Sequence, residues 1–283
     1  MEKYRSSTGK TLLIAAICCL LFLAGDLCGS VVFDLLFSII SLSNSAWYQM
    51  FRMSGCLLIT VLFFWLYTEK CLHLKRTDFR IAFSIQKWGV AFALLLPAFV
   101  VLAFLAVGKG EVHRFSLGDG LLIAAASMAA AVKAGVLEET LFRGFLMHLL
   151  ENRWNRRVAV LAPSVLFSLA HIPSMDSFTA EGVALLIISG SLVGVMFSLV
   201  AYQGNAIGNS VLLHSMWNFV IASDILHITT AQGAYGTPLF QITLPSGNAL
   251  LTGAGFGAEA SFLAILGYAA VCCAVLFLQK KSL

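Results

Sequence analysis

Three short polar motifs lie in a chain that is otherwise strongly apolar, and their spacing suits hydrolytic chemistry. The first is Glu138-Glu139-x-x-x-Arg143, with the second glutamate and the arginine four residues apart. An acid four residues before a base forms a favourable ion pair on a helix, so Arg143 can neutralise Glu139. Glu138 points about 100° further round the helix and is left available for another partner. The alternative is that both glutamates simply mark a helix end at the membrane surface.

The second and third motifs each place two side chains on one helix face. In Phe167-x-x-x-His171, the histidine could serve as a general base near neutral pH, although a lone histidine on an apolar helix is more often structural. His214-x-x-x-Asn218 offers two hydrogen-bond donors one turn apart, which suits a developing oxyanion. Polar contacts between helices are the other interpretation. No carboxylate that could orient His214 is evident, unless Asp224 folds back toward it.

The chain that must position these motifs has the composition of a membrane protein. Of its 283 residues, 59% are hydrophobic and only 11% are charged, and the mean hydropathy is +0.90. A soluble domain is nearer to one quarter charged, and no polar stretch here is long enough to form one. We therefore expect an all-α polytopic helical bundle that forms one membrane domain, residues 1–283.

About eight apolar runs are long enough to be membrane spans. They cover Thr11–Leu42, Trp47–Tyr67, Trp88–Val107, Gly120–Leu150, Val158–His171, Val183–Tyr202, Ile207–Leu226 and Phe262–Leu278. The fourth run is too long for one straight crossing, so its second half is expected to bend or to follow the membrane boundary. All three motifs lie within residues 120–224, which we expect to be the catalytic core.

Basic residues predict the orientation of the bundle. With eight spans, one side of the membrane receives Lys3, Arg5, Lys10, Lys70, Lys75, Arg76, Arg80, Lys87, Arg153, Arg156, Arg157, Lys280 and Lys281. The other side receives Arg52, Lys109 and Arg114. The positive-inside rule then predicts a multi-pass protein of the cell membrane with both termini in the cytoplasm. The net charge of +4 reflects this asymmetry and does not indicate nucleic-acid binding. Because Glu138 lies nearer the basic end of its span, we expect cleavage in the cytoplasmic half of the bilayer.

Taken in order, the three motifs resemble those of the CPBP family. That family comprises the CAAX prenyl endopeptidases and bacterial relatives, some of them linked to bacteriocin self-immunity. The resemblance covers roughly Gly120 to Asp224, and every named motif position matches. It implies an intramembrane endopeptidase in which Glu138 and His171 activate the water molecule that attacks the scissile carbonyl.

The resemblance assigns supporting roles to the other motif residues. His214 and Asn218 would hold the oxyanion, and Glu139 with Arg143 would fix the first motif's helix. Phe167 would shape the pocket around the second-motif histidine. The partners implied are a peptide or membrane-protein substrate and the lipid bilayer, and nothing in the sequence identifies the substrate.

A metal cofactor is not required by these motifs. The family is often described as metalloprotease-like, and one glutamate with two histidines could ligate a divalent metal such as zinc. The sequence contains no HExxH motif, however, and a glutamate and a histidine can activate water without a metal. We therefore expect that no cofactor is required, and a divalent metal such as zinc is the alternative.

Other classes of membrane protein fit less well. A rhomboid-like serine protease needs a GxSxG-type serine, which Ser189–Gly194 does not supply, and Gly253–Glu259 lacks the GxGD of presenilin-like proteases. A transporter would show discontinuous helices in two related halves. The remaining alternative is a non-proteolytic scaffold or immunity protein of the same fold, for which Glu138 would be dispensable.

Overall fold

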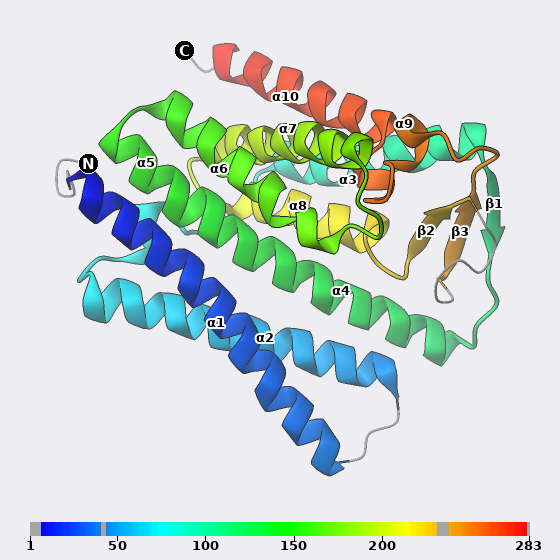
Figure 1. The fold of residues 1–283 in the computed structure, drawn as a ribbon, viewed down its shortest axis with the longest axis horizontal. Coiled ribbons are helices and arrows are strands. Elements are labelled where there is room, and N and C mark those ends of the chain that lie inside the picture. The colour runs from blue at the N-terminus through cyan, green and yellow to red at the C-terminus, as the bar shows by residue number, and fades with distance from the viewer. Residues whose placement is uncertain (1–6, 41–43, 231–237, 282–283) are drawn as a thin grey trace.

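The computed structural model describes residues 7–40, 44–230 and 238–281, and helices dominate it (Figure 1). Lys3 and Arg5, which contribute to the predicted orientation, lie outside the described residues. The α-helices are α1 Thr8–Ile40, α2 Ser45–Leu66, α3 Lys87–Val107, α4 Leu117–Glu139, α5 Met147–Arg153, α6 Arg156–Ala170, α7 Ala180–Gly204, α8 Gly208–Ile221, α9 Ala249–Thr252 and α10 Phe262–Lys281. The 3₁₀- and π-helical segments are η2 Tyr67–Cys71, η3 Arg76–Phe79, η4 Thr140–Leu146, η5 Ile172–Ser174 and η6 Ala258–Ala260.

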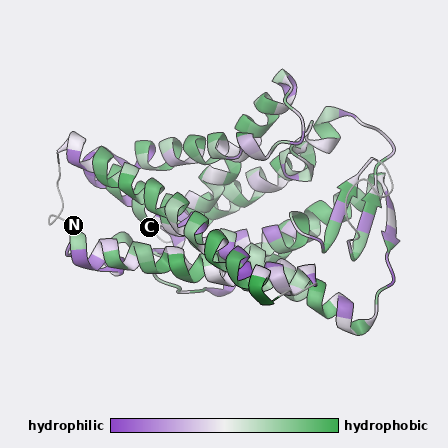
Figure 2. Cartoon of the chain, turned by 60° about the horizontal axis from the view of Figure 1, so that its bottom comes forward, coloured by the Kyte–Doolittle hydropathy of each residue, from purple (hydrophilic) through white to green (hydrophobic). Residues whose placement is uncertain are grey.

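The expected all-α membrane bundle is confirmed, with one difference in the spans. Among the described residues, seven helices are long and apolar enough to cross a membrane. The eighth predicted span, Ile207–Leu226, contains α8, which ends after 14 residues at Ile221. Most of α8 is buried against α3, α4 and α7, so its apolar sequence reflects burial in protein as well as in lipid. Figure 2 shows hydrophobic residues along most of the length of the outer helices.

The fourth span is one continuous helical stretch from Leu117 to Arg153, about 55 Å long at 1.5 Å per residue. The expected departure from a straight helix is a π-helical segment, Thr140–Leu146, which begins directly after the two glutamates. Such π-helical turns occur often at functional sites, because they rotate the following side chains relative to a regular helix.

The two ends of the bundle differ. Helix α1 begins and helix α10 ends at the same end of the bundle (Figure 1). The opposite end carries a small sheet in the order β1-β3-β2, formed by β1 Lys109–Val112, β2 Leu226–Thr229 and β3 Phe240–Thr243. β1 pairs with β3 in antiparallel fashion, and β2 pairs with β3 in parallel. The three strands are short and far apart in the chain, so no sequence pattern indicated this sheet.

Charged side chains in the first two helices are paired. Lys133 Nζ on α4 lies 2.5 Å from Asp26 Oδ1 on α1. Asp34 on α1 accepts hydrogen bonds from Tyr48 and from Arg52 Nε, the latter at 3.1 Å. Pairing lowers the cost of holding charge at membrane depth, so these residues have a structural explanation.

Candidate active site

Helices α4, α6 and α8 bring one residue of each motif together. Glu138 Oε2 lies 3.9 Å from His171 Nε2 and 3.8 Å from His214 Nε2. Both distances exceed that of a direct hydrogen bond, and Glu138 Oε2 has no hydrogen-bond partner among the described residues. The unpaired acid of the first motif therefore faces both motif histidines.

Glu139 makes a more extensive set of contacts than the sequence indicated. Its Oε1 accepts a hydrogen bond from Arg143 Nη1 at 2.9 Å and another from His214 Nδ1 at 3.0 Å. The spacing of four residues on a helix predicted the ion pair between Glu139 and Arg143, and the structure shows that this pair is fully buried. Glu139 is also the carboxylate that orients His214. Asp224 does not fold back to fill that role, because it pairs with His227, whose hydrogen bond lowers the pKa of the Asp224 carboxyl.

Arg143 ties the first motif to α7. Its Nη2 donates a hydrogen bond to the carbonyl oxygen of Gly194 at 3.0 Å. The guanidinium carbon also lies 4.9 Å from the ring centroid of Phe167 and 5.2 Å from that of Phe197. Such cation–π contacts are strongest where water is excluded, as it is here. Phe167 thus contacts the supporting arginine as well as the His171 ring, whose centroid is 4.5 Å away.

A glycine sets the distance between α4 and α8. A Cβ atom added at Gly135 would lie 2.3 Å from Ser215 Oγ and 3.0 Å from the Ser215 backbone nitrogen. Gly135 is one turn before Glu139, and Ser215 follows His214 directly. The absence of a side chain at Gly135 therefore allows the close approach in which Glu139 reaches His214.

The hydrogen bonds of the two histidines fix where their ring protons lie. His171 Nδ1 is 2.7 Å from the carbonyl oxygen of Phe167, which can only accept, so Nδ1 carries the proton. His214 Nδ1 donates in the same way to the ion-paired carboxylate of Glu139. In a neutral imidazole the Nε2 atom is then an acceptor, and both Nε2 atoms face Glu138. Glu138 Oε2 and the two Nε2 atoms are thus three hydrogen-bond acceptors that face one another. A hydrogen-bond donor such as a water molecule suits the space between them.

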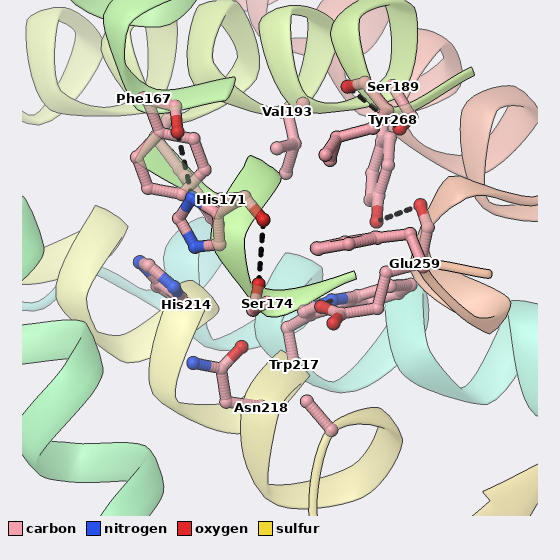
Figure 3. Close-up of a pocket in the computed structure, with 15 residues that line it drawn as sticks. Phe167, His171, Ser174, Ser189, Val193, His214, Trp217, Asn218, Glu259 and Tyr268 are labelled. Atoms are coloured by element: carbon pink, nitrogen blue, oxygen red, sulfur yellow. Dashed lines mark hydrogen bonds between the residues drawn. The ribbon is translucent and has the colours of Figure 1, made fainter. Parts of the chain in front are cut away.

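A cavity of about 300 Å³ adjoins the histidines. Asn218 lines it one turn beyond His214, and Figure 3 shows both side chains on the same side of α8. The cavity reaches the sheet-side ends of the helices, because its lining includes Ala222, which follows α8, and Glu259, which precedes α10. The expected depth of cleavage, in the cytoplasmic half of the bilayer, stays a prediction.

Glu259 is a cavity residue that lies outside the three sequence motifs. Its Oε1 accepts a hydrogen bond from Trp217 Nε1 at 2.7 Å, and the Tyr268 hydroxyl donates to its backbone oxygen at 3.1 Å. Burial raises the pKa of the Glu259 carboxyl, and the Trp217 hydrogen bond opposes that shift. In the sequence, this glutamate appears only as an acid shortly before an apolar run, and no local pattern indicates that it turns inward.

The described residues do not form a ready-made metal site. Among them, no group of three His, Cys, Asp or Glu side chains has an arrangement that could hold a metal ion. Tetrahedral zinc with nitrogen ligands at about 2.0–2.1 Å would bring the ligand atoms within about 3.3–3.4 Å of one another. Glu138 Oε2 is farther than that from both Nε2 atoms. These three atoms are therefore not positioned as zinc ligands in this structure.

Comparison with known protein families gives one finding. Residues 120–220 match the family described as "Type II CAAX prenyl endopeptidase Rce1-like". The match spans all three motifs, from Glu138 to Asn218, and it confirms the resemblance drawn from them. No curated protein matches the chain.

Proposed function

Residues 120–220 are those of a CPBP-type intramembrane protease within a multi-pass membrane protein, and from this premise we propose that the protein is an intramembrane endopeptidase. It hydrolyses a peptide bond with a water molecule activated by Glu138 and His171. The observation that carries the proposal is the placement of Glu138 Oε2, which has no hydrogen-bond partner of its own and lies within 3.9 Å of both motif histidines.

Water activation uses two acceptors next to each other, Glu138 and the cavity-lining His171. As the water oxygen attacks the scissile carbonyl carbon, one water proton passes to Glu138, assisted by the Nε2 acceptor of His171. A general base at this position contributes about 10²–10⁴ to the rate. The same proton is then delivered to the nitrogen of the breaking C–N bond, which leaves as the amine.

His214 and Asn218 stabilise the negative charge that forms on the carbonyl oxygen. Because His214 Nδ1 donates to Glu139, its Nε2 can donate to an oxyanion only when the ring is an imidazolium. The hydrogen bond from Nδ1 to Glu139 Oε1 holds the ring with its Nε2 toward Glu138. Glu139 therefore acts through His214, as a positioning residue and not as the base. The Asn218 amide supplies the second donor one turn along α8.

The proposed setting is the cell membrane, with both termini in the cytoplasm. The support is the concentration of basic residues at the end of the bundle where the termini lie. In that orientation the cavity opens toward the outer face, because it reaches the sheet-side ends of α6 and α8. A peptide or the extracytoplasmic part of a membrane protein would reach Glu138 from that side.

The test is cleavage mapping by mass spectrometry with the full-length chain in membranes. Wild-type protein and Glu138→Gln are incubated with peptide and membrane-protein substrates, with Glu181→Gln as the control for an exposed acid on α7. We expect cleavage products from wild type and the control and none from Glu138→Gln. Equal cleavage by wild type and Glu138→Gln would refute the proposal. If the cellular phenotype also survives Glu138→Gln, a non-proteolytic scaffold or immunity role replaces it.

A further inference from the structure

The cavity next to the histidines has a carboxyl group in its wall that water activation does not use. Glu259 lines this cavity and also a second one of about 360 Å³ on its sheet side. The Trp217 indole holds one carboxyl oxygen, Oε1, by the 2.7 Å hydrogen bond. Figure 3 shows the Glu259 side chain between Trp217 and Tyr268, across the cavity from His171. Glu259 is thus held in a fixed position close to the proposed site of bond cleavage.

The charges around the cavity are out of balance. Glu259 lines the cavity, whereas Glu138, Glu139 and the single arginine Arg143 lie next to the histidines that line it. The arginine is paired with Glu139, and no salt bridge to Glu259 is found among the described residues. Burial disfavours a carboxylate that has no cationic partner, so a cation that enters the cavity would be favoured beside Glu259.

The remainder of the cavity wall suits a long aliphatic chain. The rings of Phe167, Phe197, Trp217 and Tyr268 contribute to it, together with Leu186 and Val193. A volume of about 300 Å³ is at the lower end for ligand pockets and suits one extended side chain with its adjoining backbone. Lysine and arginine combine an alkyl stem that packs on apolar surface with a charged head that needs an acid.

We propose that this cavity is a specificity subsite for a lysine or arginine side chain beside the scissile bond, and that Glu259 is the residue that selects it. The inference rests on the proposed peptidase function and adds the chemical class of the substrate. The cationic head pairs with the Glu259 carboxylate, and the stem lies on the aromatic rings. This pairing holds the scissile carbonyl near Glu138 and the two histidines.

A purely structural role for Glu259 predicts a different result. In that case its task would be to accept the Trp217 hydrogen bond, which the amide oxygen of Glu259→Gln can still do. A structural role would lower the cleavage of all substrates alike. A specificity role changes the ratio between a charged and an uncharged substrate.

The experiment first exposes the full-length protein, in membranes, to a peptide library generated by chymotrypsin, which retains internal lysine and arginine. Mass spectrometry identifies the cleavage sites. The best site is then made as two peptides, one with lysine and one with norleucine, which keeps the alkyl stem but lacks the charge. The ratio of kcat/KM for the two peptides is measured for wild type, Glu259→Gln, Glu259→Asp and the exposed-acid control Glu181→Gln.

We expect wild type and Glu181→Gln to prefer lysine by at least about 30-fold, the effect of one buried charge pair. Glu259→Gln should bring the ratio close to one, and Glu259→Asp, which keeps the charge, should retain a clear preference. A wild-type ratio near one, or an unchanged ratio in Glu259→Gln, overturns the subsite while leaving the peptidase intact. Absence of any Glu138-dependent cleavage overturns the peptidase function and the subsite together.

Discussion

Replacing the two neighbouring glutamates by glutamine, one at a time, should separate catalysis from stability. Glu139 Oε1 accepts two hydrogen bonds, from Arg143 at 2.9 Å and from His214 at 3.0 Å, and its side chain is fully buried. Hydrogen bonds to a charged group contribute about 1.5–3 kcal/mol each, which gives about 3–6 kcal/mol for the two. Breaking a buried ion pair costs about 3–5 kcal/mol, so both routes lead to a similar figure.

The same reasoning gives a small stability effect for the adjacent acid. Glu138 Oε2 accepts no hydrogen bond among the described residues, so Glu138→Gln should change the free energy of unfolding by less than about 1 kcal/mol. Its cleavage rate should nevertheless fall by about 10²–10⁴-fold, because the general base is lost. Glu139→Gln should lower the free energy of unfolding by about 3–5 kcal/mol, a large share of a typical total.

The two variants are compared by denaturant unfolding in detergent micelles and by peptide cleavage followed by mass spectrometry. Because both substitutions replace glutamate by glutamine in consecutive positions of one helix, each serves as the matched control for the other. The reasoning is refuted if Glu138→Gln is as destabilised as Glu139→Gln, or if Glu138→Gln cleaves at the wild-type rate.

Three further predictions concern packing, access and metal. Gly135→Ala should destabilise the protein by about 1–3 kcal/mol and lower cleavage, because its Cβ would collide with α8. The control Gly120→Ala on the same helix meets its nearest atom only at 3.9 Å and should be tolerated. Unfolding and cleavage assays that fail to distinguish the two variants would contradict this prediction. In a background without native cysteines, Ser174→Cys should react with a membrane-impermeant maleimide added outside intact cells and Arg157→Cys should not, and the reverse labelling would invert the proposed orientation. Cleavage that depends on Glu138 should persist in the presence of a zinc chelator, and its complete loss, restored by added zinc, would show that a metal assembles at the site.

The sequence alone determined that most of this protein lies in lipid, and it supplied the three motifs of the candidate site. A composition of 59% hydrophobic and 11% charged residues leaves lipid as the environment of most helices. The ion pair of Glu139 with Arg143 also followed from the sequence, since helical periodicity fixes the geometry of residues three or four apart. The order of the three motifs was sufficient to indicate the family, which the match over residues 120–220 confirms.

Tertiary structure decided which partners these residues meet across the bundle. The hydrogen bond between Glu139 and His214 joins residues 75 positions apart and depends on the close approach at Gly135, which no local pattern encodes. Glu259 enters the cavity only because the segment before α10 packs against Trp217. Hydropathy could not distinguish the short α8 from a full span, because a helix buried in protein and a helix in lipid are equally apolar. Periodicity acts over a few residues, whereas the site is assembled from helices far apart in the chain, and their packing alone sets its distances.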